Sequence, residues 1–380
     1  MGHGGETAVS GKSGIGLCLS GGGYRAMVFH LGALLRLNEA GLLKHLSRVS
    51  SVSGGSITAA YLGLRWKDLD FDPGGRANAL DIVVDKIREM ASTTIDAGAI
   101  LGGILMPGSI SDRVAAAYDR VLFHGAGLDH LPDDDHGPRF VINATNVQTG
   151  ALWRFSQPYM GDYRVGLVAN PKTQLSLAVA ASSAFPPVLS PLTLDIDEEA
   201  KWDDAGDLPD TAFRGKVVLS DGGVYDNLGL EPVIKSCRTV LVSDAGQKIS
   251  PEVGPHHDWA RHSIRILDIV DNQVRSLRKR ALIDSYQARA ILGCYWGIRS
   301  DIKDYALVSD PLAAESRDPS YLAAIPTRLQ AMPGEEQERL INWGYAVTDA
   351  ALRKHFAVDL EAITGRKLAE PEGFPYRVGY

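Results

Sequence analysis

The feature that most constrains this chain is a strand–turn–helix pattern that occurs twice near its start. The apolar run Ile15–Leu19 stops at a serine and three glycines, and helical spacing of apolar residues follows as far as Gly41. Residues 49–52 form a second short strand that stops at the tight turn Ser53-Gly54-Gly55, and residues 57–64 resume a helical pattern. Two successive units of this kind predict parallel strands joined by crossover helices, and therefore an α/β fold.

The rest of the chain extends this prediction to a mostly parallel sheet flanked by helices. Residues 139–145, 216–219 and 239–242 have the apolar character of further strands, and residues 151–156 are expected to pair with a neighbouring strand. An alanine-rich helix over residues 175–184 should end at Pro186-Pro187, because proline cannot continue a helix.

The domain organisation follows from the same patterns. We expect a flexible segment over residues 1–13 and a single domain over residues 14–380. Residues 66–137 alternate helical stretches with glycine and proline breaks, which predicts a cap inserted over the sheet. Residues 255–365 are mostly helical in pattern and should pack on the sheet. Two sets of apolar residues there keep helical spacing: Ile264, Leu267, Val270, Val274 and Leu277, then Leu340, Trp343, Val347 and Leu352.

Composition narrows the class of protein. With 380 residues, 45% of them hydrophobic, the chain can bury a large core, and its net charge of −7 argues against a nucleic-acid partner. Cys18, Cys237 and Cys294 lack the close spacing of metal ligands, so reduced thiols are expected. The first 13 residues lack the apolar core of a secretory signal, and the longest apolar stretch, residues 97–107, is shorter than the roughly 20 residues that span a bilayer. These features predict a cytoplasmic protein whose membrane contact is peripheral.

The first candidate site feature is the glycine loop Gly21-Gly22-Gly23, followed by Tyr24 and Arg25. Glycines between a strand and a helix let several backbone N–H groups point at one position, next to the positive end of the helix dipole. Such a loop suits an oxyanion or a phosphate. Arg25 is unfavourable beside that end of the helix, which indicates an anion nearby or a role in supporting the loop. A plain tight turn, with Arg25 in a surface ion pair, is the alternative interpretation.

The second feature is the serine turn, residues 51–55. It fits the nucleophile-elbow pattern G-x-S-x-G at Ser53 and Gly55, with Ser51 in place of the first glycine. Small residues are needed there because the strained turn brings neighbouring backbone close. The amide of Gly54 would complete an oxyanion hole with the glycine loop. An ordinary Ser/Gly-rich connection is the simpler alternative.

The third feature is Asp221-Gly222-Gly223, which directly follows a predicted strand. Side chains at the carboxyl ends of strands face the crevice where open α/β sheets bind their ligands. An aspartate hydrogen-bonded to Ser53 can take its proton as a general base. Asp-Gly is also common in simple turns, so this motif alone does not settle a role.

Together these three motifs resemble the signature of the patatin-like phospholipases, a family that includes relatives of cytosolic phospholipase A2. The family pattern G-G-G-x-[RK] matches residues 21–25, G-x-S-x-G matches residues 51–55 except at Ser51, and D-G-[GA] matches residues 221–223. The family also tends to carry a small-residue helix ending in proline, similar to residues 180–186. The resemblance covers about residues 14–245, and the last third of the chain adds little to it.

The resemblance implies a lipid acyl hydrolase that cleaves phospholipid acyl esters with a Ser53–Asp221 dyad, through an acyl-enzyme and without a catalytic histidine. No metal or cofactor is expected. His30 falls inside the first predicted helix, where a packed role is the simpler one, and His256-His257 would point apart in regular structure. The apolar residues 100–106 suit either a buried cap helix or a surface that contacts acyl chains or membrane.

Three other functions stay open. Gly11-Lys12-Ser13 is similar to the end of a P-loop, although Glu6 stands where that motif requires glycine and no strand precedes it. A non-catalytic lipid-binding or signalling protein on the same scaffold is a second possibility. A hydrolase that stays inactive until a partner or small molecule opens it is the third.

Overall fold

The computed structural model describes residues 13–95, 109–203, 205–247, 249–314 and 318–380. Its strands are β1 Ile15–Leu19, β2 Leu46–Val52, β3 Arg139–Asn146, β4 Ala151–Phe155, β5 Tyr159–Asp162, β6 Gly166–Ala169, β7 Leu192–Asp195, β8 Lys216–Asp221, β9 Thr239–Asp244 and β10 Leu292–Gly297. Its α-helices are α1 Gly23–Glu39, α2 Gly54–Leu64, α3 Asp81–Ala91, α5 Ile110–Tyr118, α6 Leu175–Ser182, α7 Thr211–Arg214, α8 Gly223–Asp226, α9 Glu231–Ile234, α10 Trp259–Gln287, α11 Ser320–Ala324, α12 Gly334–Ala351 and α13 Ala357–Thr364.

All these strands form one sheet with two different halves. Strands β10, β9, β1, β2 and β3 lie side by side and are parallel, as the strand–turn–helix pattern predicted. Strands β4, β5, β6, β7 and β8 continue the sheet with antiparallel pairing. The α/β fold is therefore confirmed, while the sheet is more evenly mixed than "mostly parallel" suggests, because its second half is built from short hairpins.

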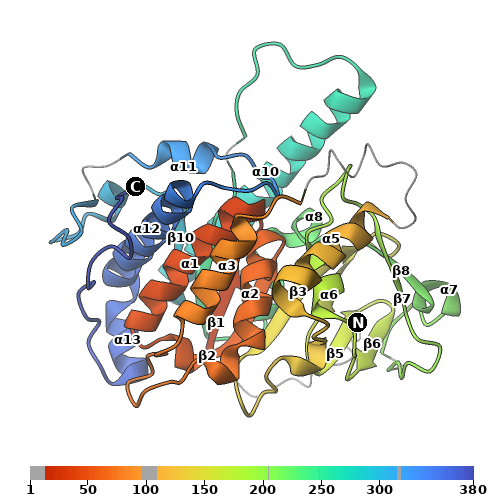
Figure 1. Cartoon of the computed structure of the whole chain (residues 1–380), viewed down its shortest axis with the longest axis horizontal. Coiled ribbons are helices and arrows are strands. Elements are labelled where there is room, and N and C mark those ends of the chain that lie inside the picture. The colour runs from red at the N-terminus through yellow and green to blue at the C-terminus, as the bar shows by residue number, and fades with distance from the viewer. Residues whose placement is uncertain (1–12, 96–108, 204, 248, 315–317) are drawn as a thin grey trace.

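Alternation along the parallel strands divides the core between the two faces of the sheet. Leu17 and Leu241 point into the larger cluster, whereas Cys18, Val240 and Val242 point into a smaller one on the opposite face. Helices α1, α2, α3 and α12 cover the larger side (Figure 1), and α9 with the last turns of α10 cover the other. No described helix combines the length and the apolar character that crossing a bilayer requires.

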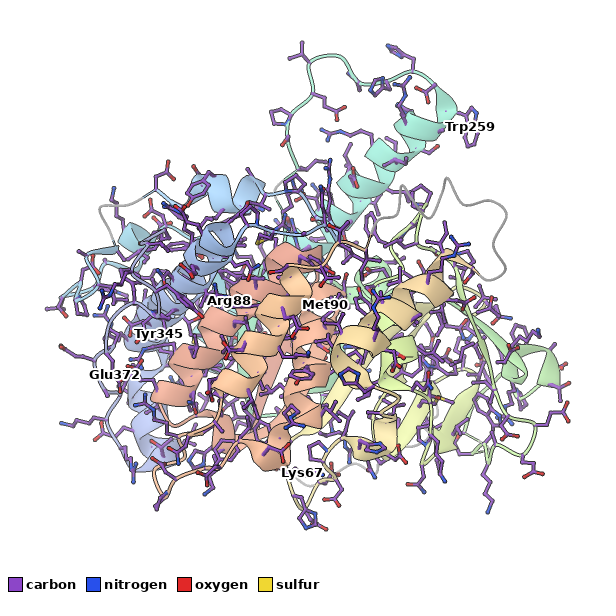
Figure 2. All side chains as sticks on the ribbon, viewed as in Figure 1. Lys67, Arg88, Met90, Trp259, Tyr345 and Glu372 are labelled. Atoms are coloured by element: carbon purple, nitrogen blue, oxygen red, sulfur yellow. The ribbon has the colours of Figure 1, made fainter. Side chains whose placement is uncertain are left out.

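Helix α12 is the main contribution of the last third of the chain to this core. It packs against α1 at very short range: a Cβ atom on Gly32 would lie 2.0 Å from the carbonyl oxygen of Ile341. A Cβ atom on Gly344 would likewise lie 2.2 Å from the carbonyl oxygen of Phe29. Figure 2 labels Tyr345 of α12 and Arg88 of α3, two helices of this layer that contact each other. Leu340, Trp343, Val347 and Leu352 are buried, and α12 contacts β10 as well as α1.

The region predicted as a cap, residues 66–137, contributes α3 and α5 to the helical layer. Helix α3 contacts α1 and α2, and α5 contacts α6. Residues 96–108 lie outside the described residues, so the apolar segment 100–106 and its suggested contact with acyl chains or membrane receive no structural account. Residues 1–12, which include most of the P-loop-like segment, are also outside them.

Candidate active site

The serine turn is a strained elbow between β2 and α2. β2 ends at Val52, α2 begins at Gly54, and Ser53 between them has φ 51° and ψ −122°. A positive φ is unfavourable for a residue with a Cβ atom, and it persists only where the surroundings hold it. Ser53 is buried apart from 8% of its surface. This geometry lifts one hydroxyl out of the backbone at the end of a parallel strand.

Helix α6 holds this elbow in place. The backbone N–H of Ser53 donates to the hydroxyl oxygen of Ser182 at 2.9 Å, and the hydroxyls of Ser182 and Ser56 are also 2.9 Å apart. Ser56 in turn donates to the hydroxyl of Ser51 at 3.0 Å. The hydroxyl at position 51, where the family pattern has glycine, is therefore part of a buried network that fixes the turn.

Asp221 reaches Ser53 through the register of the sheet. β4 occupies one edge of β3 from Ile142 to Asn146, so β2 and β8 share the other edge. Val52 lies opposite Asn143 and Asp221 lies opposite the next residue, Ala144. Since β8 is antiparallel to β3 while β2 is parallel to it, the two strands meet head-on and their last residues face each other.

Asp221 lies near Ser53 for a different structural reason than the sequence predicts. The sequence predicts Asp221 at the carboxyl end of a strand, where it would face the crevice of an open α/β sheet. The structure brings the two residues together, but from opposite strand directions. The end of α6 and the residues that follow it contact the Asp221 turn: the carbonyl of Ala184 accepts from Asp221 N at 2.9 Å, and that of Ser182 accepts from Gly222 N at 3.2 Å. One short segment thus ties both turns together.

The carboxyl group of Asp221 is buried and close to ionisation balance at neutral pH. Burial raises its pKa to about 7, and the negative charge of Asp271 acts in the same direction. Hydrogen bonds from the Gly223 N–H, at 2.7 Å from Oδ1, and from the Ser53 side chain lower the pKa against this effect. A carboxylate with a pKa near neutrality that accepts a bond from a serine is suited to proton transfer.

The glycine loop lies against the serine turn. A Cβ atom on Gly21 would be 3.1 Å from the Cβ of Ser53, and one on Gly54 would be 2.0 Å from the carbonyl oxygen of Gly23. Gly22 and Gly23 have φ 145° and 59°. Only glycine permits these dihedral angles together with backbone contact at this range. The N–H of Gly21, which the sequence predicts as part of the oxyanion hole, instead donates to the carbonyl of Asn227 at 3.1 Å. In the described part of the chain, the N–H groups of Gly22, Gly23 and Gly54 donate to no protein acceptor.

Arg25 lies behind this loop and is 1% exposed. Its Nη2 and Nε donate to the carbonyl oxygen of Ala245 at 2.9 and 3.2 Å, and its Nη1 donates to that of Ile325. Burial lowers the pKa of Arg25 to about 10. These contacts correspond to the loop-supporting role among the sequence interpretations. Because the guanidinium is buried and bonded to these two carbonyls, Arg25 neither forms a surface ion pair nor points toward a lipid head group.

A segment from the last third of the chain also crosses the glycine loop, and no sequence pattern indicated it. The carbonyl of Arg328 accepts from the N–H of Tyr24 at 3.0 Å, and a Cβ atom on Gly23 would lie 2.8 Å from that same oxygen. Leu329 accepts from the N–H of Ile95 at 2.8 Å. Residues 325–329 therefore form one wall of the site, on the side of α1.

The histidines that the structure describes take no direct part in this arrangement. His30 is fully buried, its Nε2 donates to the carbonyl of Ser20 at 3.0 Å, and its Nδ1 lies 2.8 Å from the hydroxyl of Ser243. Burial lowers the pKa of His30 to about 4, so the ring is neutral at physiological pH. Among the described residues, no hydrogen bond joins a histidine to Ser53 or Asp221, and no group of side chains has the makeup of a metal site.

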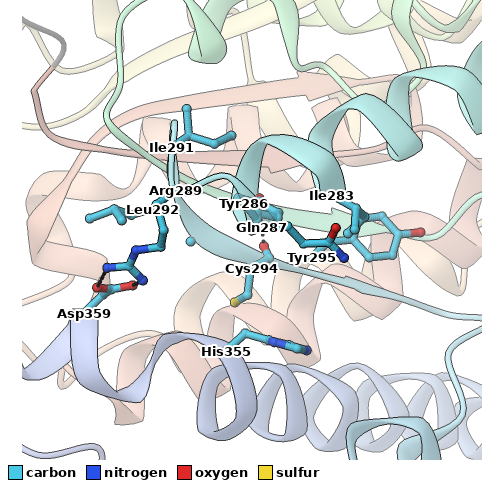
Figure 3. Close-up of a pocket in the computed structure, with 11 residues that line it drawn as sticks. Ile283, Tyr286, Gln287, Arg289, Ile291, Leu292, Cys294, Tyr295, His355 and Asp359 are labelled. Atoms are coloured by element: carbon cyan, nitrogen blue, oxygen red, sulfur yellow. Dashed lines mark hydrogen bonds and ion pairs between the residues drawn. The ribbon is translucent and has the colours of Figure 1, made fainter.

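A separate pocket of about 210 Å³ lies by strand β10, between the end of α10 and α13 (Figure 3). The ion pair between Arg289 and Asp359, at 3.0 Å, crosses its wall, and His355 and Tyr286 point toward it. Its lining includes neither residue of the serine–aspartate pair. The pocket is therefore not part of the candidate active site.

A serine on a strained strand-to-helix turn, beside a carboxyl group and free backbone amides, is the arrangement found in serine hydrolases. The family model for patatin-like phospholipases matches residues 17–234, which is more than half of the chain. This chain belongs to the patatin-like phospholipase family, and so to a family of lipid acyl hydrolases. All three motifs lie inside the matched range.

Solved structures support the same fold. Human GIVD cytosolic phospholipase A2 superposes with a TM-score of 0.52 at 15% identity, over 93% of this chain and 60% of that one. The same human enzyme in complex with methyl γ-linolenyl fluorophosphonate and terbium chloride gives 0.51 at 16% identity, over 93% and 59%. The chain thus spans about three fifths of the length of these structures. No curated protein matched it in sequence.

Proposed function

We propose that this protein hydrolyses fatty-acyl esters of membrane phospholipids, with Ser53 as the nucleophile and Asp221 as the base. The observation that carries the proposal is the head-on meeting of β2 and β8, which sets the Ser53 hydroxyl against a buried carboxyl group whose pKa lies near 7. Patatin-like family membership supplies the substrate class, since the geometry of the turn alone would serve any acyl ester.

The proposed reaction has two halves. Asp221 accepts the proton of the Ser53 hydroxyl while the Ser53 oxygen attacks the ester carbonyl. The backbone amides of Gly22, Gly23 and Gly54 bind the resulting oxyanion. Collapse breaks the bond to the glycerol oxygen, which leaves with the proton from Asp221, and an acyl-enzyme remains. Water then gives a proton to Asp221 as its oxygen attacks the acyl carbonyl. Collapse breaks the bond to the Ser53 oxygen, which takes that proton from Asp221, so the fatty acid is released and the Ser53 hydroxyl is restored.

Contact with the membrane surface and a cytoplasmic location belong to this proposal. The substrate resides in a bilayer, so the protein must bind at its surface. The three cysteines are free and buried, as suits a reducing compartment.

The test compares wild type with Ser53→Ala and Asp221→Asn on a panel of phospholipid vesicles, with mass-spectrometric detection of free fatty acid and lysophospholipid. Both variants should lose at least about 10⁴-fold in turnover, as in other serine hydrolases that lose a member of the catalytic set. Ser285→Ala, at the far end of α10, is the matched serine control and should keep full activity. Fatty-acid release that persists in the Ser53 variant would overturn the mechanism.

A fluorophosphonate probe separates this function from the non-catalytic alternative. The wild-type protein should become labelled at Ser53, and the Ser53→Ala variant should remain unlabelled. A correctly folded wild type that neither reacts with the probe nor releases fatty acid, even on addition of cell lysate, would instead support a lipid-binding protein on this scaffold. Labelling that appears only after lysate is added would support a regulated enzyme.

A further inference from the structure

Helix α10 projects from the edge of the sheet that carries the candidate site. Strand β9 is parallel to β1 and β2, so its last residue, Asp244, lies at the same edge as the serine turn. From there the chain runs out to Trp259 and returns along α10, whose 29 residues span about 43 Å. Figure 1 shows the first half of this helix standing clear of the body, and Figure 2 places Trp259 at its outer end.

The outer half of α10, residues 259–270, exposes large apolar side chains. Trp259 is 84% exposed, Leu267 58% and Val270 53%. Ile264, Ile266 and Ile269 are also exposed. Polar contacts occupy the remaining narrow side: Arg265 donates to the carbonyl of Ser250 at 2.7 Å in the returning loop. We call residues 259–270 the α10 arm. A broad apolar surface of this kind in water marks an interaction site.

Apolar side chains also surround the candidate site itself. Phe185 follows Ala184, whose carbonyl accepts from Asp221 N, and it is 52% exposed. Val224, three residues beyond Asp221, is 55% exposed and lies in α8, which packs against α10. Exposed apolar side chains therefore lie beside the candidate site and on the short helix that packs against α10.

The charge of α10 differs from that of the rest of the protein. Its 29 residues contain six basic and three acidic side chains, in a chain whose net charge is −7. Two of the basic residues, Arg261 and Arg265, lie on the α10 arm, where they pair with Asp258 and Glu252, and the other four lie between residues 275 and 280. A helix that combines exposed tryptophan and leucine with basic residues binds at the boundary of anionic membranes.

We propose that the α10 arm is the docking surface for an anionic lipid bilayer. Trp259, Leu267 and Val270 enter the boundary between head groups and acyl chains, and the edge with Ser53 and Asp221 then faces the membrane. This inference rests on the proposed function, since the bilayer is also the source of the substrate. The competing occupant is a second copy of this chain, which the experiment below distinguishes.

The experiment measures binding to vesicles of phosphatidylglycerol and phosphatidylethanolamine by sedimentation. All proteins carry Ser53→Ala, so the lipid stays intact and binding is independent of hydrolysis. The variant Trp259→Ala/Leu267→Ser/Val270→Ser should bind at least about tenfold more weakly, because each lost insertion is worth roughly that factor. The control Val358→Ser removes an equally exposed apolar side chain from α13 and should bind as the parent does.

Two further readouts complete the test. Brominated acyl chains should quench the fluorescence that Trp259 contributes, measured as the difference between the parent and its Trp259→Phe variant. With Ser53 restored, the arm variant should show a lower ratio of vesicle hydrolysis to hydrolysis of a water-soluble short-chain ester. A protein that binds vesicles but cleaves neither substrate would contradict the proposed function and leave the docking surface standing.

Three results would overturn the docking proposal. The first is vesicle binding by the triple variant as tight as that of the parent. The second is an absence of bromine quenching at Trp259 while the protein is bound. The third is light scattering that shows a dimer in the parent and a monomer in the triple variant, with vesicle binding unchanged, which would assign the arm to a second copy of the chain.

Discussion

The glycine turns at the candidate site and the α10 arm stand at opposite extremes of packing, although they lie at the same edge of the sheet. At the turns, backbone touches backbone: a single added Cβ atom at Gly54 would lie 2.0 Å from a carbonyl oxygen. On the arm, Trp259 and Leu267 are mostly in solvent. At the glycine turns the residue type is determined by close backbone packing inside the protein. On the α10 arm the exposed apolar residues make few contacts within the protein, so their residue type is determined by what the arm binds.

The largest expected effect comes from adding one carbon atom to the tight region. Gly54→Ala forces the serine turn away from the glycine loop, so an oxyanion would lose its bound geometry, and we expect turnover to fall by about 10²–10³-fold or more. Gly334→Ala is the matched control, since a Cβ atom there meets nothing within 4 Å. Assay with a soluble ester, together with circular dichroism, measures both. Equal activity of the two variants would show that the turn is not tightly constrained.

The pH dependence of the tight region is the next largest effect. Asp221 must be ionised to accept a proton, and burial raises its pKa to about 7, so kcat/KM should fall about tenfold per pH unit below 7 and level off above it. A profile that is level between pH 5 and 8 would contradict a base with this pKa.

The same raised pKa has a consequence for stability. Because the folded state prefers the protonated carboxyl, its contribution is favourable below about pH 4 and is lost as the pH rises through about 7. Asp221→Asn removes this loss, so it should unfold at higher denaturant concentration than wild type at pH 8, with a smaller difference at pH 5. Urea titrations at both pH values measure this, and an equal difference at both would exclude the linkage.

Ser182→Ala should have a moderate effect through the elbow it supports. The variant leaves the N–H of Ser53 without its acceptor, which should lower kcat roughly tenfold with little change in KM and cost about 1–3 kcal/mol of stability. Ser176→Ala, a buried serine earlier in the same helix, is the control. A change in KM alone, with kcat retained, would mean that Ser182 acts on substrate binding instead of on the nucleophile.

The smallest expected effect is on the arm. Leu267→Ser should change the free energy of unfolding by less than about 0.5 kcal/mol, because its side chain contributes almost nothing to the core. Leu340→Ala, on the buried helix α12, should cost about 2–5 kcal/mol. Thermal unfolding of the two variants makes the comparison directly. A loss above 1 kcal/mol for Leu267→Ser would show that the arm packs against the body in solution.

How much the sequence revealed depends on how local the interaction is. Strand β1, the glycine loop and the serine turn are encoded by adjacent residues, so their patterns predicted them well. The head-on meeting of β2 and β8 depends on pairing between residues about 80 to 90 positions apart along the chain, and no local pattern records that register. The wall formed by residues 325–329 is equally remote from the loop that it contacts.

The two C-terminal helices illustrate a second limit. Residues 264–277 and 340–352 both have apolar side chains at helical spacing, and both were expected to pack on the sheet. Helix α12 does so, whereas Leu267, Val270 and Leu277 of α10 are exposed. Periodicity shows that a helix has an apolar side, but it carries no information on what covers that side. The strands β5, β6, β7 and β10 were missed because they are short or interrupted by glycine.

The shared edge of β3 has a consequence for how this protein tolerates change. The distance between nucleophile and base is set by two adjacent residues of β3, Asn143 and Ala144, which pair with the last residues of β2 and β8. Adjacent residues of a strand are about 3.4 Å apart. The long acidic connection between β7 and β8 makes none of the strand pairs that align Ser53 with Asp221. Insertions in that connection should leave hydrolysis intact, whereas a shift of β8 by two residues along β3 would move Asp221 roughly 7 Å away from Ser53.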